Sequence, residues 1–138
     1  MDYTLLAARA SEAKKHSFSP YSRFRVGAAL LTSDGRIITG CNVENSSYGL
    51  TICAERTALF KAVSEGEHSF SAIAIASDED TFTPPCGACR QVIFELAGNI
   101  DVVLTKKNGV YVTKKMIELL PHPFDGKNLK KTTRKKKK

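Results

Sequence analysis

Apolar residues near the start of the chain repeat with the period of a helix. Leu6, Ala10 and Ala13 stand at positions i, i+4 and i+7, which is the spacing of one face of an α-helix. We therefore predict an amphipathic helix over residues 4–15. The segment around Pro20 is rich in serine, and because proline and serine favour turns, the helix is expected to end before it.

A different pattern, typical of strands, follows this helix. Residues 24–32 and 36–42 are rich in β-prone side chains, and they flank the sequence Ser-Asp-Gly at residues 33–35. This composition predicts a β-hairpin with a tight turn. Residues 26–31 are apolar on both alternating faces, as expected for a strand that is covered on both sides.

Two helices in the centre of the chain are predicted from one shared apolar stripe. The segment after Cys53 carries apolar residues at positions 58, 59, 62 and 63, and the segment after Cys89 carries them at 92, 93, 96 and 97. Each stripe has helical spacing and ends near a glycine, which favours a helix terminus.

Short strands are expected between and after these two helices, over residues 72–76, 101–105 and 110–113. The last two are separated by an Asn-Gly turn, and a short helix over residues 114–120 closes the pattern. Strands that alternate with helices predict an α/β fold. We expect three layers, with a mixed five-stranded sheet flanked by helices.

The charge of the chain is concentrated at one end. The formal net charge is +7, but residues 127–138 hold eight basic residues and no acidic one, so the rest of the chain is near neutral. The length of 138 residues fits one domain. We predict a single domain over residues 1–126 and a basic, disordered tail over residues 127–138. We do not expect the domain to bind nucleic acid, except for weak contact through this tail.

Targeting signals are not recognised in the sequence. No apolar run approaches the roughly 20 residues that a membrane-spanning helix needs. The first residues, Met-Asp-Tyr-Thr, lack the basic and apolar regions of a signal peptide. We expect a cytoplasmic protein without membrane contact. In that compartment the four cysteines are better explained as metal ligands or buried thiols than as disulfides.

The candidate chemistry lies at the starts of the two central helices. A Cys-x-x-Cys pair, Cys86 and Cys89, follows Pro85, and a third cysteine, Cys53, precedes Glu55 by two residues. Helix N-termini lower the pKa of a thiol, and the thiolate is the form that binds zinc. Zinc-dependent nucleobase deaminases combine this spacing of ligands with a glutamate that carries protons. The pattern predicts a zinc ion held by three cysteines, with Glu55 as the catalytic residue.

Two other interpretations of the cysteines remain open from the sequence. Cys41 could complete a closed, structural four-cysteine site, although its position is better explained as that of a small buried side chain. Cys86 and Cys89 could instead form a redox-active dithiol, which leaves Cys53 and Glu55 without a role.

The sequence resembles the small homotetrameric cytidine deaminases. The resemblance is carried by residues 40–45 (Gly-Cys-Asn-Val-Glu-Asn), 53–58 (Cys-Ala-Glu-Arg-Thr-Ala) and 85–91 (Pro-Cys-Gly-Ala-Cys-Arg-Gln). It begins with Pro-Tyr-Ser at residues 20–22 and extends to Phe124, in the order of the family. The all-cysteine zinc set is that of the tetrameric branch.

The resemblance implies hydrolytic deamination of free cytidine and deoxycytidine to uridine and deoxyuridine, with release of ammonia, in pyrimidine salvage. One Zn²⁺ per subunit would be expected, with attack of a zinc-bound hydroxide at C4 and Glu55 as the proton shuttle. It also implies a homotetramer in which neighbouring subunits complete each site.

Substrate contacts follow from the same resemblance. Asn42 and Glu44 would hydrogen-bond the ribose 3′-hydroxyl, Phe24 would pack against the pyrimidine, and the backbone of Ala54 would help to recognise the exocyclic amine. Ser46 stands beside this run, where the family pattern has alanine.

Three further residues have expected roles around the site. Tyr48 and Phe124 match the positions that reach into a neighbouring subunit, and Arg56 matches an arginine that hydrogen-bonds the cysteine sulfurs. Alternative functions are a blasticidin-type deaminase, a polynucleotide editor and a non-enzymatic zinc adaptor. The run at residues 42–45 argues against the first, the near-neutral domain against the second, and Glu55 against the third.

Overall fold

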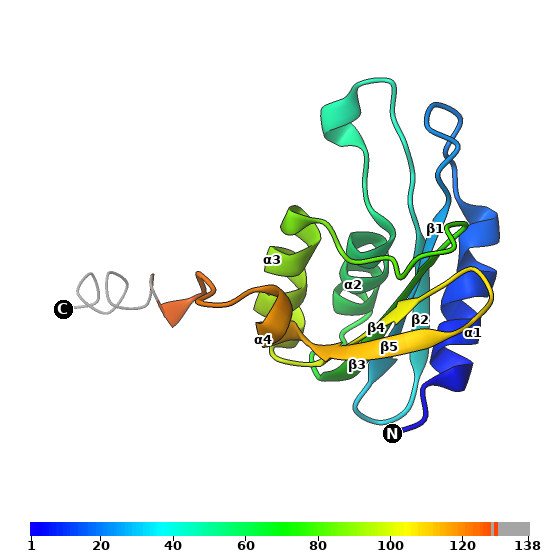
Figure 1. Ribbon diagram of the computed structural model, residues 1–138. Helices are drawn as coiled ribbons and strands as arrows, with labels where there is room; N and C mark the ends of the chain where they lie inside the picture. The colour runs from blue at the N-terminus through cyan, green and yellow to red at the C-terminus, as the bar shows by residue number, and fades with distance from the viewer. Residues whose placement is uncertain (128, 130–138) are drawn as a thin grey trace.

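A five-stranded sheet forms the centre of the protein (Figure 1). The computed structural model describes residues 1–127 and 129, so the tail predicted over residues 127–138 lies almost wholly outside the described residues. The strands are β1 (Val26–Thr32), β2 (Ile37–Cys41), β3 (Phe70–Ser77), β4 (Asp101–Thr105) and β5 (Tyr111–Lys115). The helices are α1 (Thr4–Ala13), α2 (Ala54–Ser64), α3 (Gly87–Ala97) and α4 (Met116–Leu119), with short 3-10 turns at Lys14–His16 and Tyr48–Leu50.

The strand order in the sheet is β2-β1-β3-β4-β5. β1 pairs antiparallel with both β2 and β3, β4 pairs antiparallel with β5, and β3 and β4 are parallel. A parallel pair needs a crossover connection, and α3 supplies it between β3 and β4. The sheet is therefore mixed, as the sequence predicts.

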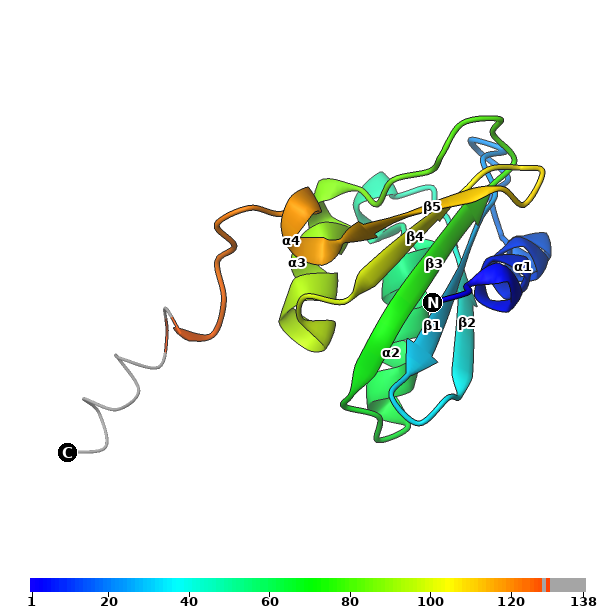
Figure 2. The same ribbon diagram turned by 60° about the horizontal axis from the view of Figure 1, so that its bottom comes forward.

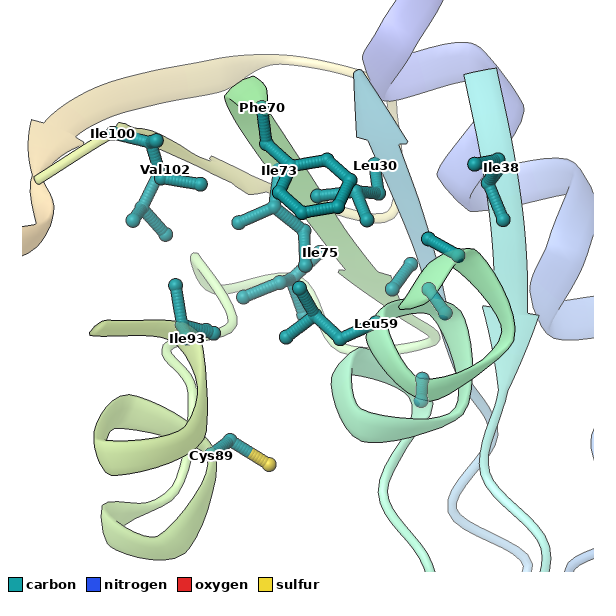
Figure 3. Close-up of a cluster of buried hydrophobic side chains, with 14 of the residues drawn as sticks. Leu30, Ile38, Leu59, Phe70, Ile73, Ile75, Cys89, Ile93, Ile100 and Val102 are labelled. Atoms are coloured by element: carbon teal, nitrogen blue, oxygen red, sulfur yellow. The ribbon is translucent and has the colours of Figure 1, made fainter. Parts of the chain in front are cut away.

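Helices cover both faces of the sheet (Figure 2). α1 packs on one face, where Leu6 and Ala10 join a cluster of small side chains from β1 and β3. α2 and α3 lie on the other face, over the larger cluster shown in Figure 3. In that cluster Leu59 and Ile93 from the helices are fully buried against the sheet, and Cys89 belongs to it. The three-layer α/β architecture is confirmed.

Two glycines allow the helices to approach the sheet closely. A Cβ atom on Gly27 would lie 2.0 Å from the carbonyl oxygen of Ala10 in α1, and one on Gly40 would lie 2.5 Å from the backbone nitrogen of Ala58 in α2. Glycine within a strand often marks such a close approach of two backbones. Gly40 thereby sets the distance between β2 and the helix that begins at the candidate site.

The predicted elements are all present, and some of their ends differ. The expected strand over residues 24–32 begins only at Val26, because the side chain of Asn42 binds the backbone there: Asn42 Oδ1 accepts from Val26 N, and Asn42 Nδ2 donates to Phe24 O. The expected helix over residues 114–120 is shorter, because Lys114 and Lys115 extend β5 and pair with β4.

The structure adds two observations on regions outside the core. The 3-10 turn at Tyr48–Leu50 lies in the long loop that connects β2 and α2, and it was not predicted. Among residues 1–127 and 129, none of the helices combines the length and the apolar character that crossing a membrane requires.

Candidate active site

Three thiols gather where α2 and α3 begin. Cys53 is the N-cap residue of α2 and Cys86 that of α3, while Cys89 lies in the first turn of α3. The Sγ atoms of Cys53 and Cys86 are 3.7 Å apart, those of Cys86 and Cys89 are 3.3 Å apart, and all three lie within 4.8 Å of one another. Both helices therefore direct the unpaired N–H groups of their first turns toward one group of sulfurs.

The spacing of these sulfurs fits a tetrahedral metal site. With Zn–S bonds of about 2.3 Å, neighbouring thiolates around one ion are about 3.8 Å apart. The donor set suits the same ion, because thiolate sulfur is a preferred ligand of zinc. The three predicted ligands are thus brought together in an arrangement that could hold one zinc ion.

Electrostatics in the thiol group favour a cation. Hydrogen bonding with the Cys89 thiol, and then with Arg56, lowers the pKa of Cys53 to about 5. The pKa of Cys89 is raised, first by its hydrogen bond with Cys53 and then by burial. A second thiolate beside the first is therefore disfavoured unless a positive charge compensates it, and metal binding supplies that charge.

Arg56 contributes a fixed positive charge beside the sulfurs. Its Nη2 donates to Cys53 Sγ at 3.4 Å. Its Nε is buried without a hydrogen-bond partner among the described residues. Donors of this kind around metal-binding thiolates reduce their negative charge and tune the metal.

Glu55 is the buried carboxylate of the site. It lies in the first turn of α2, its exposed fraction is 4%, and it lines the cavity that also contains Cys53 and Cys86. Burial raises the pKa of Glu55 to about 7, and the negative charge of Cys53 acts in the same direction. A carboxyl group with this pKa can both accept and donate a proton near neutral pH.

The cavity beside the thiols has a volume of about 240 Å³. It is smaller than the roughly 300–1,000 Å³ of typical ligand pockets. Glu55, Cys53 and Cys86 line it, together with four predicted contact residues: Phe24, Asn42, Glu44 and Ala54. Thr83 and Pro84 also line it. They were not predicted, because they stand in an irregular segment before Cys86.

Asn42 is largely occupied by contacts within the chain. Its Oδ1 accepts from Ser17 Oγ at 2.5 Å and from Val26 N at 3.0 Å, and its Nδ2 donates to Phe24 O at 2.8 Å. A carboxamide has two acceptor positions and two N–H donors. One N–H of Asn42 therefore remains for a ligand, and the rest of the side chain holds the segment that carries Phe24.

Glu44 is held by the segment that precedes β1. Its Oε1 accepts from the backbone nitrogens of Tyr21 and Ser22 at 3.0 and 3.1 Å, and its Oε2 accepts from the hydroxyl of Ser22. The hydrogen bond from the Ser22 hydroxyl is the main cause that lowers the pKa of Glu44. The carboxylate is thus ionised and fixed at the edge of the cavity.

Tyr48 and Phe124 do not line this cavity in the described chain. The exposed fraction of Tyr48 is 79% and that of Phe124 is 58%. Tyr48 lines an adjoining cavity that shares Glu44 and Thr51 with the site. The backbone oxygen of Phe124 accepts from Gln91 Nε2 at 2.8 Å, so the motif that contains Cys89 also anchors the segment of Phe124.

Cys41 stands apart from the thiol group. It is a free, half-buried cysteine at the end of β2, and burial raises its pKa. The group of possible metal ligands found among the described residues consists of Cys53, Cys86 and Cys89 without it. All four cysteines are free thiols, so none of them forms a disulfide. The position of Cys41 outside the group argues against a closed four-cysteine site.

The fold and the site together define a class of protein. Three convergent thiols on an α/β scaffold, with a buried carboxylate and a cavity beside them, are the parts of a zinc-dependent hydrolytic deaminase. Residues 2–106 match the family model described as "Cytidine and deoxycytidylate deaminase zinc-binding region". The chain belongs to this family.

Individual relatives agree with this assignment. A cytidine deaminase from Sporosarcina psychrophila is 48% identical over 130 residues, which cover 94% of this chain and 96% of that protein. The crystal structure of a cytidine deaminase from Burkholderia pseudomallei matches with a TM-score of 0.86 and 46% identity, covering 90% of this chain and 100% of that chain. A blasticidin-S deaminase from Bacillus cereus is 35% identical over 108 residues, covering 72% and 76%.

Proposed function

We propose that this protein deaminates free cytidine and deoxycytidine to uridine and deoxyuridine, with release of ammonia. The observation that carries the proposal is the position of Glu55, buried beside the thiols of Cys53 and Cys86 in a cavity that also reaches Asn42 and Glu44. One end of this cavity suits an amidine group that exchanges protons, and the other end suits a sugar hydroxyl.

Cys53, Cys86 and Cys89 would hold the zinc ion, one per subunit. When bound there, the zinc ion would acidify a water molecule and so supply a nucleophile near neutral pH. Arg56 supports the thiolates through its hydrogen bond to Cys53 Sγ. Since three thiolates and one divalent ion leave a net negative charge, this donor and the two helix N-termini keep the metal electrophilic.

Glu55 would move the protons of the reaction. In its ionised form the carboxylate accepts a proton from the attacking water and transfers it to N3 of cytosine, which makes C4 more electrophilic. Once the water oxygen has bonded to C4, the carboxylate takes the second proton of that oxygen and delivers it to the exocyclic amine. The C4–N bond then breaks, the amine leaves as ammonia, and the C4 carbonyl of uridine forms. Its raised pKa keeps both protonation states accessible, and that is what a shuttle requires.

The sugar end of the cavity is suited to one hydroxyl group. Asn42 has one free N–H, and Glu44 presents an ionised carboxylate. A ribose 3′-hydroxyl could accept from the first and donate to the second. Phe24, which is 40% exposed, supplies an apolar surface for the pyrimidine, and Ala54 offers the backbone at the start of α2, where N–H groups lack helical partners.

Neighbouring subunits would complete the site in a homotetramer. Tyr48 and Phe124 are aromatic, exposed and outside the cavity of their own chain. The small volume of that cavity also fits a site that a second chain encloses. We assign the enzyme to pyrimidine salvage in the cytoplasm as part of the same proposal.

The test is ammonia release and loss of ultraviolet absorbance when cytidine is added to the purified, zinc-loaded protein. Wild-type protein is expected to turn over. Glu55→Gln should retain zinc and fold but lose about 10²–10⁴-fold in kcat, the contribution typical of general acid–base catalysis.

Turnover by Glu55→Gln at the wild-type rate would contradict the role of this carboxylate. No turnover by zinc-loaded wild-type protein would contradict the nucleoside substrate and favour another amidine, such as that of blasticidin S.

A further inference from the structure

The hydroxyl of Ser22 connects two segments that the proposed function assigns to the substrate. Ser22 Oγ donates to Glu44 Oε2 and accepts from the backbone nitrogen of Phe24 at 3.0 Å. One hydroxyl therefore uses both its donor and an acceptor position to join the carboxylate at the sugar end to the segment at the base end.

The hydrogen bonds to Glu44 leave little freedom to its carboxylate. Two carboxylate oxygens offer about four acceptor positions, and three are taken by Tyr21 N, Ser22 N and Ser22 Oγ. The fourth position belongs to Oε2. Because Ser22 Oγ is the partner of Oε2, it determines where the last free acceptor position points.

The surroundings of Glu44 explain why this orientation needs a partner. Glu44 lines two adjoining cavities, the site cavity with Phe24 and Asn42 and a second one of about 320 Å³ with Tyr48. A flexible glutamate at such a boundary can turn its carboxylate toward either space. Ser22 stands in the wall of the second cavity and holds Oε2 from that side.

We propose that Ser22 is a positioning residue for sugar recognition. By fixing Glu44 Oε2, it directs a single acceptor toward a single ligand hydroxyl, for which Asn42 supplies the complementary N–H. This inference rests on the proposed nucleoside substrate. Ser22 acts on sugar recognition through Glu44 and does not itself contact the substrate. Ser22 thereby sets the discrimination between nucleosides with and without a 3′-hydroxyl.

The experiment compares kcat/KM for cytidine and for 3′-deoxycytidine in zinc-loaded wild-type enzyme and in Ser22→Ala. The wild type is expected to prefer cytidine by about tenfold or more, the factor that a hydrogen bond to a charged group supports. In Ser22→Ala this ratio should fall by about three- to tenfold, through KM rather than kcat. Any effect of the lost contact with Phe24 N acts on both nucleosides and cancels in the ratio.

Two further variants make the result specific. Ser22→Thr keeps a hydroxyl and should keep the wild-type ratio. Ser33→Ala removes a serine that pairs with Ser69 Oγ at 2.7 Å, beyond the opposite end of β1, and should also leave the ratio unchanged.

The outcomes separate this inference from the function on which it rests. A wild type that strongly prefers cytidine, with an equal preference in Ser22→Ala, overturns the role of Ser22 alone. A wild type that deaminates both nucleosides equally well overturns the sugar contact of Glu44 and, with it, the role of Ser22. A wild type without activity on either overturns the proposed function itself.

Discussion

Asp78 shows how single charged residues keep the segment before β1 in place. Its carboxylate makes two hydrogen bonds with Arg25, Nε to Oδ2 at 2.7 Å and Nη2 to Oδ1 at 3.0 Å. Lys14 Nζ lies 3.2 Å from Oδ1 and also donates to the backbone oxygen of Ser77. Arg25 directly follows Phe24 in the sequence. The segment before β1 is therefore anchored twice, by the ion pairs of Arg25 with Asp78 and by the hydrogen bond of Asn42 to Phe24 O.

This cluster makes the stability of the protein depend on pH. The hydrogen bonds with Arg25, followed by those with Lys14, lower the pKa of Asp78 to about 2 from its ordinary value of 3.8. A carboxyl group whose pKa is lower in the folded state stabilises the fold above its unfolded pKa, and it loses this effect as the pH falls toward the folded pKa. The contribution of Asp78 is therefore expected to disappear between about pH 4 and pH 2.

The measurement is Tm as a function of pH for wild type and Asp78→Asn. The wild type should be the more stable near pH 6, and the two curves should converge as the pH falls below 4. Asp80→Asn is the matched control, because Asp80 is exposed and has no ion pair among the described residues. A constant difference in Tm across this range would rule out the ionisation of Asp78 as its cause.

Individual site residues could be predicted from the sequence where their spacing is short. Cys53 and Glu55 are two residues apart, and Cys86 and Cys89 are three apart, so local helix geometry brings out the pattern. Asn42 lines the cavity and also binds other segments of its own chain. This second role could not be predicted, because its partner Ser17 is 25 residues away. Ser22 lies within a recognised motif, but only the fold shows that its hydroxyl meets Glu44.

At the scale of elements, the position of α2 depends on its contact with β2. Gly40 faces Ala54 and Ala58 of that helix, and a Cβ atom there would lie 2.8 Å from the Ala54 oxygen and 2.5 Å from the Ala58 nitrogen. Backbone atoms cannot yield as a side chain can. The start of α2, which carries Cys53 and Glu55, is therefore placed by the absence of a side chain in the neighbouring strand.

Gly40→Ala should consequently disturb both stability and the site. Pushing α2 away from β2 is expected to cost about 1–3 kcal/mol of unfolding free energy, as overpacking of a core typically does. The same shift should lower kcat and weaken zinc retention, because it moves Cys53 relative to Cys86. Denaturant unfolding, kinetics and metal content are the measurements.

Gly49→Ala provides the comparison for this change. A Cβ atom on Gly49 meets nothing within 4 Å, so its stability should stay near that of the wild type. Equal unfolding free energies for Gly40→Ala and wild type would show that the close approach of β2 and α2 is not needed.

The predicted bounds of helices and strands are most accurate where the apolar residues repeat regularly. They are least accurate where a side chain from elsewhere hydrogen-bonds the backbone. The helix predicted over residues 4–15 is present as α1 and the turn after it, and the strand over 101–105 matches β4. The strand predicted from residue 24 was too long because Asn42 takes the place of a strand partner. Such competition by a distant side chain leaves no periodic signal in the sequence.

At the scale of the whole molecule, patterns within one chain do not predict which of its surfaces contact another copy. The patterns of one chain predict a mixed sheet with helices on both faces, and the structure adds the strand order. Tyr48 and Phe124 are exposed in the single chain, and the proposed neighbouring subunits would cover them. The segment that carries Phe124 is anchored by α3. Gln91 Nε2 donates to Phe124 O, and Arg90 Nη1 donates to Leu119 O at 2.9 Å.

Shared sites predict that two defective variants can restore each other. Glu55→Gln lacks the shuttle and Phe124→Ala lacks the aromatic side chain proposed to reach a neighbour. In mixed assemblies, a Phe124→Ala subunit beside a Glu55→Gln subunit has a site with both residues. Random mixing in a closed oligomer should make roughly a quarter of the sites complete.

Co-expression of the two variants, followed by assays of the purified mixture, measures this recovery. A mixture of separately purified variants that has not exchanged subunits serves as the baseline. Activity no higher than this baseline, in assemblies shown to contain both chains, would contradict a site shared through Phe124.

The order of the strands also has a consequence for how the protein folds. β3 lies between α2 and α3 along the chain, and it occupies the centre of the sheet between β1 and β4. Its pairing joins Val26 to Ser77, and such contacts between distant residues form more slowly than local hairpins. Cys53 precedes β3 in the sequence and Cys86 follows it, so we expect the two cysteines to come together only after β3 has joined the sheet. Regain of metal affinity during refolding therefore reports the arrival of the central strand, whereas the β1–β2 hairpin can form long before it.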